Sequence, residues 1–275
     1  MRDFKKIYSK RKPWSHKGDF GYVLIVVGSE VYSGSPVFNA LAALRAGADL
    51  VNVVGHRRAM DIAATFSPDI ITRPLSSELS LKHVNEILAL SKNFDSLIIG
   101  GGLKRNEETF KAVREIIRNT NLPMVVDAEA IRAMAKDKKI LKGKNAIITP
   151  HSEEFRILTG ERVAADMKDR EAKTLKWAKI LGATILLKGH IDVISDGQKA
   201  VLNKTGSPYM TKGGFGDTLS GICGALLARR LKPFAAATAA AYINGAAGEL
   251  AAKEYGEGIL ASDILCYITK VIKNL

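Results

Sequence analysis

Short runs of β-branched and other apolar residues alternate with stretches of helical spacing along most of this 275-residue chain. The runs include YVLIVV at 22–27, LVNVV at 50–54 and ATILLKG at 183–189, and their length is typical of buried strands. Strand–helix units repeated in this order predict an α/β fold, with one mostly parallel central sheet and helices on both faces.

The predicted elements follow one another without a linker, an internal repeat or a low-complexity tract, so we expect one domain over 1–275. Asp196-Gly197 lies between two short apolar runs and predicts an antiparallel hairpin over 191–203. Segment 123–130 is predicted to be a strand followed by a turn. Segment 146–160 is predicted to be a strand, a loop and a short helix. The other predicted strand is 96–102, and the predicted helices are 35–48, 81–90, 106–119, 169–182, 217–229, 233–255 and 261–274.

Basic residues outnumber acidic ones, 41 against 28, which gives a formal net charge of +13. They are scattered, so the excess favours a solvated surface over a polyanion-binding face, and no nucleic-acid partner is predicted. The exception is a basic N-terminal arm at 1–17, which contains Lys5, Lys6, Lys10, Arg11, Lys12 and Lys17.

The cysteine count and the hydropathy pattern limit the compartment. Cys223 and Cys266 are too few for a disulfide framework, and no residues have metal-ligand spacing. No apolar run is long enough for a membrane span, and the N-terminus lacks the apolar core of a signal peptide. We therefore expect a cytoplasmic protein without membrane contact.

Glycines and polar residues follow the predicted strands. They are Gly28 to Gly34, Gly100 to Gly102, Asp127, His151 to Glu154, Lys188-Gly189 and the stretch TKGGFGDTLSG at 211–221. In open parallel sheets, ligands bind at the carboxyl ends of the strands. The sequence therefore predicts one site built from these segments.

The stretch TKGGFGDTLSG places three glycines around one carboxylate at the start of a predicted helix. If Asp217 opens that helix, the backbone N–H groups of 214–218 form an anion hole for a phosphate. Asp217 could then take a proton from an attacking hydroxyl; the alternative is that it only caps the helix. The chain has neither a P-loop nor a G-x-G-x-x-G fingerprint, which argues against a hydride-transfer enzyme.

KGGFGDTLSG resembles the GGTGD-x-L-[AS]-G stretch of ADP/ATP-dependent NAD(P)H-hydrate dehydratases, which belong to the ribokinase-like superfamily. ITPHSEEFRILTG resembles the signature T-P-H-P-G-E-[FM]-x-x-L, and ILLKGHIDVISDG resembles the V-L-K-G-x-x-[TD]-V-I hairpin. Four further segments are similar to the family and occur in the family's order: GYVLIVVGSEVYSGSPVFNALAALRAGADLV, IIGGGLKRNEET, VVDAEAI and YINGAAGELAA. The resemblance covers most of the chain and implies a ribokinase-like fold.

The resemblance also implies roles for individual residues. Asp217 matches the catalytic Asp and lies at the substrate. Glu154 matches an acid that orients metal-bound phosphates through water. The residues that match the nucleotide-binding segments are Lys188, Gly189, His190, Ile191, Asp192, Gly213, Gly214 and Gly216. Those on the side of the hydrated nicotinamide nucleotide are Ser35, Gly102 and His151, together with Asp217.

The implied activity is nucleotide-dependent dehydration of hydrated NADH or NADPH. The C6 hydroxyl of the hydrated ring is phosphorylated while Asp217 removes its proton, and phosphate then leaves. ADP or ATP is the implied co-substrate, Mg²⁺ the implied metal ion, and a homo-oligomer the implied assembly. The match begins close to the N-terminus, so we expect no epimerase domain.

Besides HSEE at 151–154, which replaces H-P-G-E and adds Glu153, three positions depart from the family pattern. Lys104 replaces a glycine in the second glycine loop, Lys212 stands where a small residue is common, and Phe215 replaces a threonine beside the anion hole.

Simpler structural roles and other functions stay open at this point. Lys188 could be a solvated residue at a strand end, His151 a capping residue, and Glu154 a residue that favours a helix N-terminus. The main functional alternative is a small-molecule kinase of the same superfamily that acts on hydroxymethylpyrimidine, hydroxyethylthiazole or pyridoxal.

Overall fold

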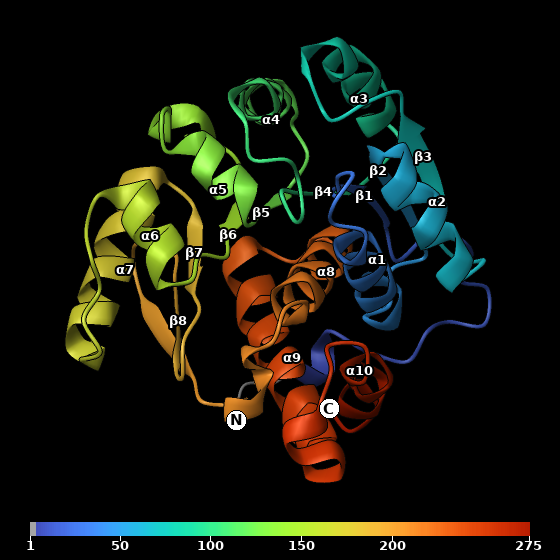
Figure 1. The fold of residues 1–275 in the computed structure, drawn as a ribbon. Helices are drawn as coiled ribbons and strands as arrows, with labels where there is room; N and C mark the ends of the chain where they lie inside the picture. Colours follow the sequence, from blue (N-terminus) through green and yellow to red (C-terminus); the bar gives the residue numbers. More distant parts are fainter. Residues whose placement is uncertain (1–3) are drawn as a thin grey trace.

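The computed structural model describes residues 4–275, which form a nine-stranded sheet with helices on both faces (Figure 1). The strand order is β3-β2-β1-β4-β5-β6-β7-β8-β9. Strands β1 to β7 pair in parallel, and β8 runs antiparallel to both β7 and β9. The strands are β1 (Tyr22–Val26), β2 (Leu50–His56), β3 (Ile71–Leu75), β4 (Ser96–Ile99), β5 (Met124–Val126), β6 (Ala146–Ile148), β7 (Thr184–Leu187), β8 (Asp192–Ser195) and β9 (Ala200–Asn203). The predicted mostly parallel sheet with an antiparallel hairpin is confirmed.

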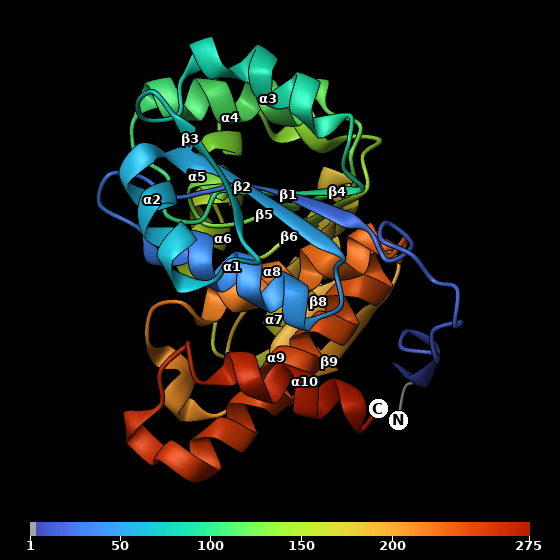
Figure 2. The ribbon, with the colours of Figure 1, turned by 90° about the vertical axis from the view of Figure 1, so that its right-hand side faces the viewer.

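Helices cover both faces of the sheet (Figure 2). Helices α3 to α7 cover one face, and α1, α2, α8 and α9 cover the other, with α10 packed against α1 and α9 on the outside. The α-helices are α1 (Gly34–Arg45), α2 (Arg57–Phe66), α3 (Val84–Ser91), α4 (Glu107–Asn119), α5 (Glu129–Met134), α6 (Ser152–Thr159), α7 (Met167–Leu181), α8 (Phe215–Ala228), α9 (Pro233–Tyr255) and α10 (Ile264–Lys273). Short 3₁₀ turns lie at Phe4–Lys6, Leu81–His83, Lys138–Leu141, Pro208–Thr211 and Gly256–Gly258.

The central strands are apolar throughout because both of their faces are buried. In β1, Leu24 and Val26 belong to the core under α3 to α7, whereas Val23 and Ile25 belong to the core under α1 and α8 to α10. This division follows from the two-residue repeat of a strand. Burial on both faces thus explains the continuous apolar run in the sequence.

Three elements were not predicted. Strand β3 is one of the two edge strands, and most of its residues are partly or fully exposed. It contains Pro74, which is tolerated at an edge because one side of the strand needs no partner. Helix α2 follows β2 directly. Helix α5 begins where a turn was predicted, after Ala128, which has a positive φ of 47°.

The described part of the basic N-terminal arm packs on the body of the protein. The Tyr8 hydroxyl donates to the Ala46 carbonyl at 3.1 Å, and the Arg11 guanidinium lies 3.5 Å above the Phe20 ring. Arg11 also pairs with Asp49 at 3.3 Å. Residues 1–3 of the predicted arm lie outside the described residues. Within 4–275, none of the helices has the length and apolarity needed to cross a bilayer.

Candidate active site

The carboxyl ends of the parallel strands surround the N-terminus of α8. Backbone hydrogen bonds hold the strand-end loops together: Gly28 after β1 donates to the Gly101 carbonyl after β4, and Lys188 after β7 donates to the Pro150 carbonyl after β6, both at 2.8 Å. A β-carbon added to Gly101 would lie 2.5 Å from Asp217 Oδ1. The strand ends and the first turn of α8 therefore meet in one place, as the sequence predicted.

Asp217 lies in the first turn of α8 but does not cap it. The cap is Gly214, whose φ of 101° is readily adopted only by glycine, and the helix begins at Phe215. Asp217 Oδ1 instead accepts a hydrogen bond from Asn39 Nδ2 of α1 at 2.9 Å. The capping alternative for Asp217 is therefore wrong, and its carboxylate points to the strand ends.

The surroundings of Asp217 adjust its protonation. Burial, together with the charge of Asp127, raises the pKa of Asp217 to about 6, against the opposing effects of Ser35, Lys188 and Asn39. A carboxyl that titrates close to neutral pH can accept a proton in the transition state and release it afterwards. These are the properties expected of a general base.

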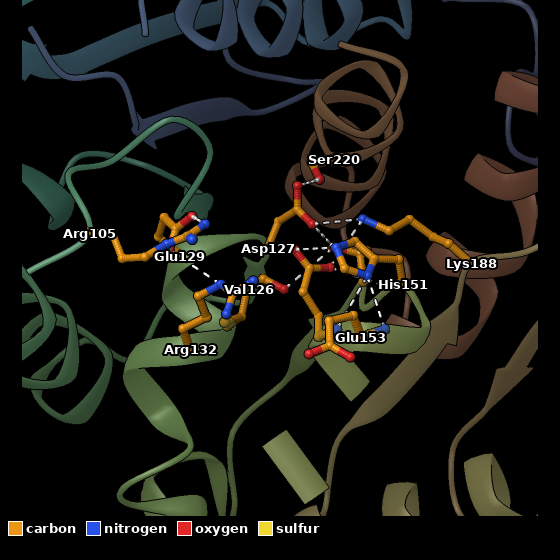
Figure 3. A network of polar contacts seen from close by, with 11 residues as sticks. Arg105, Val126, Asp127, Glu129, Arg132, His151, Glu153, Lys188 and Ser220 are labelled. Atoms are coloured by element: carbon orange, nitrogen blue, oxygen red, sulfur yellow. Dashed lines mark hydrogen bonds and ion pairs between the residues drawn. The ribbon is translucent and has the colours of Figure 1, made fainter. Parts of the chain in front are cut away.

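Lys188 and two carboxylates form a polar network between β5, β6 and β7 (Figure 3). Lys188 Nζ lies 3.2 Å from Asp127 Oδ1 and 3.7 Å from Glu154 Oε2. Burial lowers the pKa of Lys188, but the charges of Asp127 and Glu154 outweigh it, so the pKa is raised and the ammonium stays charged. The view of Lys188 as a merely solvated residue is therefore wrong.

Asp127 is held in place from several sides. Its Oδ1 accepts a hydrogen bond from Thr149 Oγ1 at 2.7 Å, and its Oδ2 accepts one from Ser220 Oγ of α8 at 3.0 Å. Together with Lys188, these partners occupy both carboxylate oxygens (Figure 3). Asp127 can therefore anchor Lys188, but it is poorly placed to accept a proton from a substrate.

His151 caps α6, as one alternative predicted. Its Nδ1 accepts hydrogen bonds from the backbone N–H groups of Glu153 and Glu154, at 3.1 and 3.2 Å. Glu154 Oε2 accepts the His151 N–H at 2.9 Å, which completes a reciprocal capping box. Since Nδ1 is an acceptor, the neutral ring carries its hydrogen on Nε2. The Nε2 atom lies 3.4 Å from Glu154 Oε1, so an Nε2–H donor is oriented by this carboxylate.

A cavity of about 660 Å³ opens beside Lys188 and the first turn of α8. Most of the predicted nucleotide residues line it, namely Lys188, Gly189, His190, Asp192 and Gly216. Among residues 4–275, the lining does not include Ile191, Gly213 or Gly214. Phe215, Leu219, Ala241 and Gly245 give the cavity a partly apolar wall. This volume and this mixture of surfaces suit a small organic ligand.

Of the predicted substrate residues, His151 lines this cavity together with the predicted nucleotide residues, whereas Ser35, Gly102 and Asp217 form a second group beside it. A β-carbon added to Gly102 would lie 3.0 Å from Ser35 Oγ, and one added to Gly101 would lie 3.3 Å from the same oxygen. Asp217 belongs to this group through Asn39 and Gly101. Gly216 joins the two groups, because it lines the cavity and its β-carbon position lies 3.6 Å from Lys188 Nζ.

Sequence reasoning missed two residues and undervalued a third. Asn39 contacts Asp217, and its only sequence signal was a polar residue within an otherwise apolar helix. Arg170 donates to the Lys188 carbonyl at 3.0 Å, and Gly189 leaves room for its guanidinium, because a β-carbon there would lie 2.5 Å from Nη2. Asp127 was recognised only as a polar residue after a strand, with no role assigned.

The three departures from the family pattern have structural explanations or lie at the surface. Lys212 Nζ donates to the carbonyls of Glu257 and Ile259, so it holds the loop after α9. Phe215 is buried in the core and lines the cavity. Lys104 is exposed, next to Arg105, which pairs with Glu129 of α5 at 2.7 Å.

The groups that could assist a metal ion are few. Within the described residues, no three His, Cys, Asp or Glu side chains gather as a metal site. Glu154 is the carboxylate that was predicted to act through water, and its oxygens lie near the His151 N–H and Lys188. Mg²⁺ is commonly held by one or two carboxylates, waters and substrate phosphates, so this arrangement fits a water-mediated contact.

Comparisons with known proteins agree with the geometry. A model of the NAD(P)H-hydrate dehydratase family matches residues 23–270. The chain is 39% identical over 275 residues to the ADP-dependent (S)-NAD(P)H-hydrate dehydratase of Cenarchaeum symbiosum, covering 98% of this chain and 95% of that one. It is 43% identical over 276 residues to the bifunctional NAD(P)H-hydrate repair enzyme of Pyrobaculum aerophilum, covering 99% of this chain. It spans about half (54%) the length of that relative.

Solved structures give the same result. The ADP/ATP-dependent NAD(P)H-hydrate dehydratase of Bacillus subtilis, co-crystallised with ATP and Mg²⁺, is similar with a TM-score of 0.80 and 28% identity, covering 96% of this chain and 94% of that one. Hydroxyethylthiazole kinase of Pyrococcus horikoshii shares the fold, with a TM-score of 0.67 and 17% identity over 92% of this chain and 89% of that one. The ribokinase-like fold is therefore confirmed, and the chain belongs to the NAD(P)H-hydrate dehydratase family.

Proposed function

We propose that this chain uses ADP or ATP to dehydrate hydrated NADH or NADPH and thereby restores the reduced dinucleotide. The observation that carries the proposal is the position of Asp217, a carboxyl with a pKa raised to about 6, at the helix start that joins the cavity to the group around Ser35. ADP is the donor named for the Cenarchaeum relative, so it is the first nucleotide to test.

The proposed reaction begins at the hydroxyl on C6 of the hydrated ring. Asp217 accepts the hydroxyl proton while the oxygen forms a bond to the terminal phosphorus of the nucleotide, and the bond from that phosphorus to the departing nucleotide breaks. The C6–O bond then breaks, and phosphate leaves with its electrons as the ring nitrogen supplies its lone pair. Loss of a ring proton from C5 restores the dihydronicotinamide.

The protein contributes position and charge in this scheme. The first turn of α8 offers backbone N–H groups that have no acceptor within the helix, and Lys188 adds a charged ammonium beside Gly216. Both would stabilise negative charge on the transferred phosphoryl group. When bound, Mg²⁺ would neutralise charge on the nucleotide phosphates, with Glu154 orienting its water ligands.

The nucleotide is proposed to bind at Lys188, Gly189, His190, Ile191, Asp192, Gly213, Gly214 and Gly216. The arrangement of the hairpin supports part of this set, because Asp192 Oδ1 accepts the Gly189 N–H at 3.0 Å and so shapes the loop beside the cavity. The hydrated dinucleotide is proposed to bind at Ser35, Gly102, His151 and Asp217, with His151 Nε2–H as a donor. We also propose that the chain forms a single domain, is located in the cytoplasm and assembles as a homo-oligomer. Light scattering, which measures molar mass in solution, would test the oligomeric state.

The test is incubation of the protein with hydrated NADH, Mg²⁺ and either ADP or ATP. The account predicts a nucleotide-dependent rise of the near-ultraviolet absorbance that dihydronicotinamides have and their hydrates lack, with release of inorganic phosphate. If no rise occurs with either nucleotide, the proposal is wrong. A stable phosphate ester of a vitamin alcohol, formed from the kinase substrates, would instead identify a small-molecule kinase.

A further inference from the structure

We infer that Asn39 is a positioning residue that holds the carboxylate of Asp217 for proton abstraction. Asn39 lies on the buried face of α1 and is 1% exposed. Its Nδ2 donates to Asp217 Oδ1 at 2.9 Å and to the Ser35 carbonyl at 3.0 Å. The inference deepens the proposed function and rests on it, because it assigns a task within the same reaction.

The contacts fix the direction of the Asn39 amide. Both neighbours of Nδ2 are acceptors, a carboxylate and a carbonyl, so an amide turned by half a rotation would place oxygen against oxygen. The absence of a side chain on Gly101 leaves room for Oδ1 on its other side, since a β-carbon there would lie 2.5 Å from it. Oδ1 is thus held by Asn39, and Oδ2 is the oxygen that we assign to the substrate hydroxyl.

Asn39 is costly as a purely structural residue. Within residues 4–275 no donor reaches its Oδ1, although that atom is buried. A buried polar atom without a partner destabilises a fold by about 1–3 kcal/mol. Its helix neighbours Ala40 and Ala43 are fully buried, and helix α8 packs closely here, because a β-carbon on Gly221 would lie 2.5 Å from the backbone oxygen of Asn39. An apolar side chain would suit this surface better for stability, so a functional role explains the amide.

The groups around Asp217 determine how the loss of Asn39 would change the pKa of Asp217. Asp127 from the end of β5 raises the pKa of Asp217, whereas Lys188 from the end of β7 and the two α1 residues, Ser35 and Asn39, lower it. Glu154 of α6 faces Lys188, and the α9 residue Asn244 bonds to Thr218 Oγ1 rather than to Asp217. A donor to a carboxylate favours the charged form, so removal of Asn39 raises the pKa of Asp217 further.

The test is the variant Asn39→Leu, which keeps the approximate size of the side chain and removes both the donor and the unpartnered oxygen. We expect kcat to fall roughly 10- to 100-fold, as for a misplaced catalytic group. We also expect the acidic limb of the kcat/KM profile to move to higher pH, while the KM for the nucleotide stays within about twofold of the parent value. Because a higher pKa of Asp217 costs stability only where the carboxyl is ionised, the melting temperature should fall relative to the parent at pH 8 and fall less, or not at all, at pH 4.

Ser96→Ala is the matched control, because Ser96 also makes a buried hydrogen bond to α8, at the Gly224 carbonyl (2.8 Å). This variant should lower the melting temperature without moving the pH profile. If Asn39→Leu behaves like this control, with lost stability and an unchanged pH profile, Asn39 is structural and the inference is wrong. Asn39→Ala replaces the leucine variant if the latter does not fold.

A measurement without substrate separates the inference from the proposed function. The carboxyl carbon of Asp217 can be followed by NMR during a pH titration of the free protein and assigned with Asp217→Asn. Titration at higher pH in Asn39→Leu than in the parent supports the inference even if the parent lacks dehydratase activity. An unchanged midpoint overturns it, whether or not the parent is active.

Discussion

Lys188 Nζ reaches from the end of β7 to within 3.2 Å of Asp127 Oδ1 at the end of β5, across the intervening strand β6. This ion pair lies between the cavity and α8, since Lys188 lines the cavity and Ser220, in the second turn of α8, donates to Asp127. Asp127 therefore acts on two groups of the candidate site. It holds the Lys188 ammonium, and its negative charge raises the pKa of Asp217.

Asp127→Asn should separate these two effects. Because Asp127 fixes the position of Lys188 Nζ and opposes the effect of burial on the Lys188 pKa, its loss should leave the ammonium misplaced and less fully charged, and we expect a KM for the nucleotide that is higher by roughly tenfold or more. Since the charge of Asp127 raises the pKa of Asp217, its removal should move the acidic limb of kcat/KM to lower pH, opposite to the shift expected for Asn39→Leu. Steady-state kinetics between pH 4 and 9 would show both effects. Ser220→Ala, which keeps the charge, is the control, and an acidic limb that moves upward in Asp127→Asn would contradict the account.

Asp217→Asn should change how stability depends on pH. The pKa of Asp217 is raised from 3.8 to about 6, so the folded state binds its proton more tightly than the unfolded chain does. Its contribution to stability is then greatest below pH 4 and is lost as the pH rises from 4 to 6. The variant should therefore be more stable than the parent at pH 8, by up to about 3 kcal/mol, and the difference should shrink toward pH 4. Thermal melts at both pH values measure this, and equal gains at both would count against the raised pKa.

Gly101→Ala should disable catalysis without unfolding the protein. The new methyl group would lie 2.5 Å from Asp217 Oδ1 and 3.3 Å from Ser35 Oγ, and the backbone of Gly101 is not in the left-handed region. The carboxylate must therefore move, which should lower kcat by roughly 100-fold. Gly258→Ala is the control, because a β-carbon there has no neighbour within 4 Å. Full activity in Gly101→Ala would mean that Asp217 is not held where the structure has it.

His151 substitutions should distinguish capping from substrate binding. His151→Ala removes the acceptor for two backbone N–H groups of α6 and should cost about 1 kcal/mol of stability. His151→Asn retains a capping acceptor, so its melting temperature should stay near that of the parent. If Nε2–H also binds the hydrated dinucleotide, both variants should raise the KM for it several-fold. A normal KM in His151→Asn would confine His151 to capping.

The sequence predicted the parts of this protein that depend on local pattern. Apolar runs predicted the buried strands, and Asp196-Gly197 predicted the hairpin between β8 and β9. The strand β3, at one edge of the sheet, was not predicted because it is largely exposed and contains Pro74. Its sequence therefore shows neither an alternation of apolar and polar residues nor a continuous apolar run. Helix α5 was not predicted because it is only six residues long and follows Ala128, whose backbone has a positive φ.

The candidate site was predictable only where one segment carried the signal. Asp217 and its glycines could be recognised because they are consecutive. The contact between Asn39 and Asp217 joins residues that are 178 positions apart, and that between Lys188 and Asp127 spans 61 positions. Such pairings arise from the packing of α1 against α8 and from the strand order, which composition and spacing do not encode. The same limit applies to Arg170, which supports the Lys188–Gly189 turn from α7.

The most direct test of the central claim follows the hydroxyl oxygen of the substrate. Hydrated NADH prepared with heavy-oxygen water carries the isotope at C6, and the reaction with ADP and Mg²⁺ can be analysed by mass spectrometry of the released phosphate. The account predicts that the label appears in the phosphate, and that Asp217→Asn releases almost none. Label found in water instead, or undiminished turnover by Asp217→Asn, would contradict phosphorylation of the hydroxyl with Asp217 as its base.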